Sequence, residues 1–238
     1  MRVTLLVQAA TEPNCYSRLT NEWICGQYIV DRKDEIVDAT VEHILITVAA
    51  VALGVLIAFP LALIARRYPR LESGILGVST GIYTIPSLAL FQILVGFSFL
   101  GLDRTTVEIA LVSYTLLILF RNTLAGLRSV PDEVREAAEG MGLTRRQVLM
   151  KVELPLALPA VFAGLRVATV TVISLATVAA FIDDEGLGSP IFRAIQSNVF
   201  KTELFAAGGL AVALALFADG ALVLIQRLLT PWARRQRA

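Results

Sequence analysis

Five long, mostly uncharged apolar stretches constrain the fold of this chain more than any other feature. The first runs from Ile44 to Ala65 and holds 22 residues, and the second runs from Gly74 to Gly101 and holds 28. An α-helix rises about 1.5 Å per residue, so about 20 apolar residues cross the roughly 30 Å hydrocarbon core of a bilayer. The second stretch is too long for one straight span and too short for two. Pro86 near its middle therefore predicts one kinked or broken span.

Three further apolar stretches follow, centred on Ile109 to Phe120, Leu156 to Ile182, and Leu204 to Ile225. Charged residues make up only 17% of the 238 residues, whereas soluble domains have about 25%. The sequence therefore predicts an all-α integral membrane protein with about five transmembrane helices. The formal net charge of +1 gives no case for nucleic-acid binding.

Five spans place the two termini on opposite sides of the membrane. If the polar loop 129–155 is inside, twelve Lys and Arg residues are inner and seven are outer, with two more inside the spans. An excess of Lys and Arg marks the cytoplasmic side. We therefore expect a multi-pass protein of the cell membrane with its N-terminus outside and its C-terminus in the cytoplasm. The expected regions are an extracytoplasmic segment 1–42, a transmembrane domain 43–230 and a cytoplasmic tail 231–238.

The segment 1–42 is polar and net negative, and it contains both cysteines of the chain, Cys15 and Cys25. A disulfide between them is permitted outside the cell, and two free thiols are the alternative. The opening MRVTLLVQAA is a weak match to a signal peptide because its apolar core is too short. We therefore expect it to belong to the mature chain.

The polar stretch from Ser129 to Pro159 predicts two short helices joined by a glycine turn. Ser129 can cap the first helix, with Asp132 completing a capping box, and Pro131 suits the first helical position. Gly140 and Gly142 are expected to end this helix.

The second helix of this stretch begins with a similar signal. Thr144 can act as its N-cap, with Gln147 three residues later as the reciprocal partner. Pro155 and Pro159 are expected to stop it where the next apolar stretch begins.

The spacing of residues within this loop resembles the EAA loop of ABC importer permeases. The matching residues are Glu136, Ala137, Ala138, Gly142, Val152, Leu154 and Pro155, with Val152 where the family usually has isoleucine. The resemblance implies a cytoplasmic coupling helix that docks on an ATP-binding subunit. Residues implied to take part are Glu136, Ala137, Ala138, Gly142, Leu143, Leu154 and Pro155. The small Ala137, Ala138 and Gly142 would let the helix lie close to that partner.

A closer resemblance covers most of residues 41–230. The segments TIPSLALF (84–91), LFRNTLAGL (119–127), VREAAEGMGLT (134–144), VELPLALPAVFAGLR (152–166) and GLG (186–188) are similar to osmoprotectant importer permeases. That family carries glycine betaine, carnitine, choline or related compounds. The acidic Asp183, Asp184 and Glu185 depart from it, because relatives tend to have small residues or glycine there.

The resemblance also implies the partners of the chain and its mechanism. A type I ABC importer joins two ATP-binding cassette subunits, a second permease chain that is identical or homologous, and a separate extracytoplasmic substrate-binding protein. The implied mechanism is alternating access driven by closure of the ATPase subunits. ATP and magnesium would be bound by the partner subunits.

No residue pattern in the chain indicates an enzyme. The sequence has no Walker motif, no metal-ligand cluster and no nucleophile paired with a base, so we expect no bound cofactor or metal. The only histidine, His43, lies at the edge of the first span. An interfacial or packing role is favoured for it over a proton relay.

Three ionisable residues, Arg121, Arg166 and Asp219, lie within apolar stretches. Such residues are costly in a membrane and usually pair or face a cavity. We favour a structural ion pair of Asp219 with Arg166 or Arg121 over a charged lining of the inward-facing cavity.

Aromatic residues around the expected break are candidates for the translocation pathway. Tyr83, Pro86 and Phe91 lie in the broken stretch, and Tyr114 lies in the next one. Aromatic faces attract quaternary ammonium groups, although aromatic residues inside membrane helices usually serve packing.

Three other functional classes remain as alternatives. The nearest is an importer permease for amino acids or another small solute. An ATP-independent secondary transporter or channel would need coupling-ion ligands in its spans, and this chain offers only Asp219. A membrane-anchored sensor would normally have a larger soluble module.

Overall fold

The structure, a computed structural model, describes residues 14–17, 20–97, 100–197 and 200–234. These residues form helices joined by turns and contain no β-strand, which confirms the all-α prediction. The helices are α1 (Gly26–Asp31), α2 (Lys33–Arg67), α3 (Pro69–Thr84), α4 (Ser87–Val95), α5 (Arg104–Arg128), α6 (Asp132–Gly140), α7 (Arg145–Val148), the π-helical segment η1 (Leu149–Glu153), α8 (Leu154–Ala179), α9 (Gly188–Gln196), α10 (Lys201–Leu229) and the 3₁₀ turn η2 (Pro231–Arg234).

Four helical stretches of the described chain are long and apolar enough to cross a membrane. They are α2, α5, the continuous run Arg145–Ala179 that joins α7, η1 and α8, and α10. The pair α3 and α4 passes the same test as a unit, with a bend of 99° between them. The expectation of about five spans therefore holds if this bent pair counts as one.

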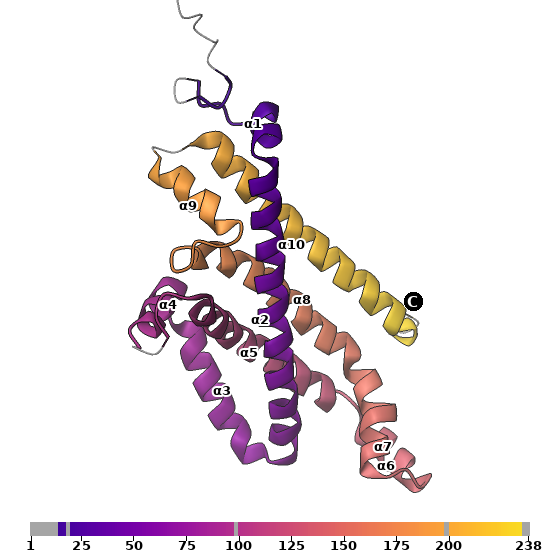
Figure 1. The fold of residues 1–238 in the computed structure, drawn as a ribbon. Helices are drawn as coiled ribbons and strands as arrows, with labels where there is room; N and C mark the ends of the chain where they lie inside the picture. The colour runs from indigo at the N-terminus through magenta and orange to yellow at the C-terminus, as the bar shows by residue number, and fades with distance from the viewer. Residues whose placement is uncertain (1–13, 18–19, 98–99, 198–199, 235–238) are drawn as a thin grey trace, which may run out of the picture.

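The bend between α3 and α4 has a local cause at Pro86. A proline disfavours the α-helical region for the residue before it. Ile85 accordingly has φ −69° and ψ 129°, which is extended, and α4 starts immediately after the proline. The predicted break thus lies at the predicted residue. The two pieces turn by almost a right angle and do not continue in one line (Figure 1).

Helix α5 forms the centre of the bundle, with α2, α8 and α3 packed around it (Figure 1). In the apolar 18-residue stretch of α5, 61% of the residues are buried, whereas only 6% are buried in the corresponding stretch of α10. Helix α10 packs against α8 and α9 and leaves most of its surface uncovered. The covalent chain therefore builds a compact core around α5, and α10 extends from its edge.

Close helix packing is visible where α2 crosses α5. A Cβ atom added to Gly54 of α2 would lie 2.1 Å from the hydroxyl oxygen of Thr115 on α5. Without a side chain at Gly54 the two backbones can approach, and small residues serve this purpose in membrane helix pairs. Buried Phe91, Leu111 and Val172 form part of a core on one side of this crossing, and Phe120 belongs to the core on the other side.

The two ends of the bundle carry different elements. We call the end that carries α6 and α7 the loop end, and the opposite end, which carries the disulfide, the disulfide end (Figure 1). Helix α2 spans the distance between them, and it runs through Pro60 as one continuous helix of 35 residues. It begins at Lys33, ten residues before the expected start of the transmembrane domain at residue 43.

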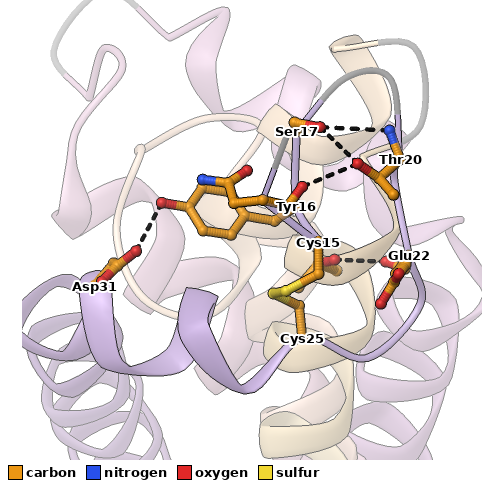
Figure 2. The surroundings of a disulfide bond; sticks show 9 residues. Cys15, Tyr16, Ser17, Thr20, Glu22, Cys25 and Asp31 are labelled. Carbon is orange, nitrogen blue, oxygen red and sulfur yellow. Dashed lines mark hydrogen bonds between the residues drawn. A yellow bond between two sulfur atoms is a disulfide. The ribbon is translucent and has the colours of Figure 1, made fainter. Parts of the chain in front are cut away.

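At the disulfide end, a bond between Cys15 and Cys25 closes the loop before α1. Figure 2 shows the ring of Tyr16 beside this bond, with its hydroxyl group donating to Asp31 at 2.7 Å. The rings of Tyr16, Tyr28 and Phe200 lie within 6.5 Å of one another, centre to centre. These contacts attach the N-terminal segment to the start of α10. The first ten residues, MRVTLLVQAA, lie outside the described residues.

Candidate functional site

The loop end contains the two helices that the sequence places between the third and fourth spans. Helix α6 begins at Asp132 after Pro131, and no side chain caps it. The prediction that Ser129 caps α6 is wrong, because its hydroxyl group donates to the carbonyl of Gly126 in the preceding helix at 2.8 Å. Pro131 precedes the first helical residue and does not occupy it.

The start of α7 agrees with the prediction. The Thr144 hydroxyl accepts a hydrogen bond from the backbone N–H of Gln147, and the Gln147 side chain accepts one from the backbone N–H of Thr144. This reciprocal capping box satisfies two backbone donors at the helix start. The prediction that Pro155 and Pro159 stop this helix is wrong, because α7, η1 and α8 form one continuous helical run. Pro155 lies in the turn of α8 that directly follows η1, and the run continues through it and through Pro159.

Gly142 makes the turn between α6 and α7. Its φ angle is 86°, which lies in the left-handed region that L-residues rarely adopt. A Cβ atom added there would meet no described atom within 4 Å. Gly142 therefore has an unusual backbone conformation but no close approach to the other described parts of this chain.

The side chains of α6 divide between solvent and the chain itself. Glu136 and Ala137 are exposed, whereas Ala138 is buried. This corrects the expectation that Ala138 lies against a partner, because the methyl group is already covered by its own chain. Leu143, Leu154 and Pro155 are half-buried. Glu136 and Ala137 are thus the predicted docking residues that α6 presents outward.

A buried ion-pair cluster lies beneath α6, and no sequence pattern indicated it. Glu153, the last residue of η1, is only 3% exposed. Its carboxylate accepts two hydrogen bonds from Arg66 in the last turn of α2. The Nε atom of Arg135 on α6 lies 2.8 Å from the Oε1 atom of Glu153, at an angle too oblique for a hydrogen bond. Arg135 also donates to the carbonyl of Leu127 at 3.0 Å.

Two of the three ionisable residues noted within the apolar stretches, Arg166 and Asp219, form an ion pair. Asp219 of α10 accepts two hydrogen bonds from Arg166 of α8, at 2.7 and 2.8 Å. Both side chains remain about one-third exposed. A cavity of about 390 Å³ adjoins the pair and is lined also by Val170 and Thr171. Arg121 is exposed elsewhere on α5 and takes no part in this pair.

The aromatic pathway candidates are placed mostly in the interior of this chain. Phe91 is fully buried, which corrects its assignment to a pathway. Tyr114 is also buried, and its hydroxyl group donates to the carbonyl of Ile85. The break at Pro86 deprives that carbonyl of a regular helical partner, so the role of Tyr114 here is structural. Tyr83 packs edge-on against Tyr114, with ring centres 5.8 Å apart, and it is 40% exposed.

His43 is fully buried between α2, α8 and the loop that leads to α9. Its Nδ1 atom accepts from the backbone N–H of Leu187 at 3.3 Å, and its Nε2 atom lies 3.1 Å from the carbonyl oxygen of Ile173. These partners fit a neutral ring that carries its proton on Nε2. His43 therefore packs in the interior of the chain.

The acidic loop after α8 is partly neutralised by Arg104 at the start of α5. Arg104 contacts Glu185 at 3.3 Å and Glu108 at 3.2 Å. Burial raises the pKa of Asp183, and the nearby Asp103 raises it further. Burial likewise raises the pKa of Glu185, with Asp183 adding to the effect. This loop therefore holds carboxylates in a setting that disfavours their ionised forms.

Within the described residues, no group of three or more His, Cys, Asp or Glu side chains is placed to hold a metal ion. The distinctive geometry of the chain is instead an exposed, glycine-hinged helix at one end of a bundle of membrane-length helices.

Comparisons with known proteins agree with this geometry. Residues 49–235 match the family described as "Binding-protein-dependent transport system inner membrane component". A choline transport system permease protein of Bacillus subtilis is 37% identical over 206 residues, which are 86% of this chain and 93% of the relative. A carnitine transport permease protein of Listeria monocytogenes is 36% identical over 198 residues, covering 83% and 89%. An osmoprotectant import permease protein of Salmonella typhimurium is 35% identical over 208 residues, covering 86% and 96%.

Solved structures show the same fold. An inward-facing structure of the MetNI methionine ABC transporter superimposes with a TM-score of 0.71 and 20% identity, covering 82% of this chain and 96% of the other. A second crystal form of that transporter gives a TM-score of 0.68 at 19% identity, covering 79% and 93%.

Proposed function

This chain belongs to the family of binding-protein-dependent transport system inner membrane components, and we propose that it is the permease subunit of an ATP-driven importer for osmoprotectants. In this role its spans form the translocation pathway, and α6 with α7 receives the movement of an ATPase. Glycine betaine, choline and carnitine are the proposed substrates. The chain itself carries out no chemical reaction.

The observation that carries the coupling role is the geometry of α6. The helix stands at the loop end, exposes Glu136 and Ala137, and is joined to the following helix through the left-handed turn at Gly142. A helix that must fit the cleft of another protein needs such an exposed face and a fixed orientation. The capping box at Thr144 and the continuous run from α7 into α8 then connect the loop directly to a membrane-length helix.

The proposed substrate class rests on the relatives and not on a cage of aromatic rings. The names of the relatives specify choline, carnitine or osmoprotectants. Phe91 and Tyr114 are buried in this chain, so only Tyr83 among the aromatic candidates offers an exposed face. We propose a small zwitterion or cation with a quaternary ammonium group, recognised mainly by a separate binding protein.

The proposed assembly is supported by the family of the chain and by the absence of a Walker motif from its sequence. Two ATP-binding subunits would bind ATP and magnesium, and a second permease chain would complete the pathway. The loop end would face the cytoplasm, and the disulfide end would face outward, where a disulfide is stable. The segment 1–42 would be extracytoplasmic, residues 43–230 would form the transmembrane domain, and 231–238 would form the cytoplasmic tail.

The test is uptake by the complex reconstituted in vesicles with its ATPase and binding protein. We expect ATP-dependent accumulation of radiolabelled glycine betaine, choline or carnitine. Accumulation of an ordinary amino acid and none of these three would overturn the substrate class while keeping the importer. Accumulation driven by an ion gradient without ATP would overturn the importer itself.

A further inference from the structure

Helix α6 has few contacts with the rest of the chain. It packs mainly on α7 and η1, and Ala138 is the only one of its nine residues that is buried. A hollow of about 460 Å³ lies between α6, α7 and the last turns of α2. A displacement of α6 therefore needs a specific link if it is to reach the membrane-length helices.

Glu153 is positioned to provide this link. Its carboxylate lies between Arg135, which belongs to α6, and Arg66, which belongs to α2, while Glu153 itself leads directly into α8. A buried carboxylate is strongly destabilising unless it stays paired. Since Glu153 is buried, its two arginines are held near it, and three helices meet at one side chain. We call Glu153, Arg66 and Arg135 the carboxylate clamp.

The π-helical segment explains why Glu153 faces inward. Between residues 145 and 157, around the π-turn, the buried residues are Val148, Glu153 and Ala157, which are spaced by five and then by four positions. Side chains four apart share one face of an α-helix, so a spacing of five needs the extra residue of a π-turn. The π-turn Leu149–Glu153 supplies that residue. Such turns occur frequently at functional sites.

We infer that Glu153 is a positioning residue for energy coupling, whose carboxylate transmits a displacement of α6 to α2 and α8 together. The inference rests on the proposed function, because it requires an ATPase that moves α6. A purely structural ion pair would affect how much complex assembles. A coupling residue would instead affect how much substrate is imported for each ATP that the assembled complex hydrolyses.

The experiment measures this ratio in the reconstituted complex for Arg135→Met and Arg66→Met. Each variant leaves Glu153 one arginine, so the buried carboxylate keeps a partner. We expect the ATPase to remain bound and active, while substrate imported per ATP hydrolysed falls by about fivefold or more, the scale of coupling between two sites of one protein. Arg135→Lys should restore part of the ratio, because lysine keeps the charge but loses the planar guanidinium group.

A matched control is available at the same end of the bundle. Arg128 of α5 pairs with Glu72 of α3 through two bonds of 2.8 and 2.6 Å, and this pair does not involve α6. Arg128→Met removes an ion pair of the same kind and should leave the ratio unchanged. Asp132→Asn, which removes the other ion-pair partner of Arg135, should also leave it unchanged.

The outcomes separate this inference from the proposed function. If the wild-type complex imports substrate and the Arg135→Met and Arg66→Met complexes have the wild-type ratio, the inference is overturned alone. An equal fall in Arg128→Met would overturn it as well, because any ion pair at this end would then have the same effect. A wild-type complex that hydrolyses ATP but imports none of the proposed substrates or any other solute would overturn both.

Discussion

Replacing Gly142 with alanine should loosen the α6–α7 turn without unfolding the spans. The φ angle of Gly142 is 86°, and the left-handed conformation costs an L-residue roughly 1–2 kcal/mol. No described atom lies within 4 Å of an added Cβ atom, so no clash within the chain adds to this cost. A change of 1–2 kcal/mol shifts a conformational equilibrium by a factor of about 5 to 30. The native turn should lose population by that factor relative to alternative loop conformations.

Gly140→Ala is the matched control for this change. Gly140 is the last residue of α6, and a Cβ atom added to it also meets nothing within 4 Å. Alanine is favoured over glycine inside a helix by about 1 kcal/mol, so Gly140→Ala should preserve or tighten the loop. The two variants add the same methyl group two positions apart, and only Gly142 has a positive φ.

Amide hydrogen exchange over residues 141–148 measures the turn directly. Exchange should be faster in Gly142→Ala by the factor above and unchanged or slower in Gly140→Ala. Gly142→Asn should lie between Gly142→Ala and the wild type, because asparagine tolerates the left-handed conformation better than alanine. In the reconstituted complex, Gly142→Ala should also weaken retention of the ATPase or its stimulation by substrate. Equal exchange and equal stimulation in the alanine variants at 140 and 142 would refute the reasoning.

Three further predictions concern other parts of the chain. Asp219→Ala should lower the yield of assembled protein because Arg166 loses its counter-charge within the span, and normal yield and uptake in both Asp219→Ala and Asp219→Asn would contradict a role for the pair. In a variant without native cysteines, a cysteine at the exposed Asp184 should react with an impermeant label added outside, whereas one at Ser73 should not; the reverse pattern would invert the proposed orientation. Asp183→Asn should raise the melting temperature at pH 7, because the raised pKa of Asp183 means that its ionisation destabilises the folded state. This gain in melting temperature should vanish below about pH 4, where the wild-type carboxyl is protonated. A gain that persists below that pH would exclude ionisation as its cause.

The features predicted well from the sequence are those that depend on local physics. The five apolar stretches correspond to four long helices and one bent pair, because the length of an apolar run directly reflects the thickness it must cross. The break at Pro86 and the capping box of Thr144 with Gln147 arise from the geometry of a few neighbouring residues. The glycine turn predicted between α6 and α7, at which Gly142 has a positive φ, belongs to the same group.

The features that the sequence did not predict depend on contacts between distant residues. Glu153 and Arg66 are 87 positions apart, and nothing in a polar loop indicates that one of its carboxylates is buried. Ser129 had a competing acceptor in the preceding helix, which the capping pattern does not reveal. Pro155 did not end a helix, and the helical run continues from the π-turn η1 through it into α8. Phe91 and Tyr114 were candidates for the translocation pathway because they are aromatic, but both are buried by packing around α5.

Helix α2 joins the two ends of the molecule as a single rod. Its 35 residues correspond to about 52 Å of helix, from the region beside the disulfide to Arg66 at the carboxylate clamp. In a helix of this length a small tilt produces a large displacement of the far end. A rotation of about 5° about one end moves the other end by roughly 4–5 Å. A displacement of about one helical turn at one end of α2 therefore requires the helix to tilt by only a few degrees.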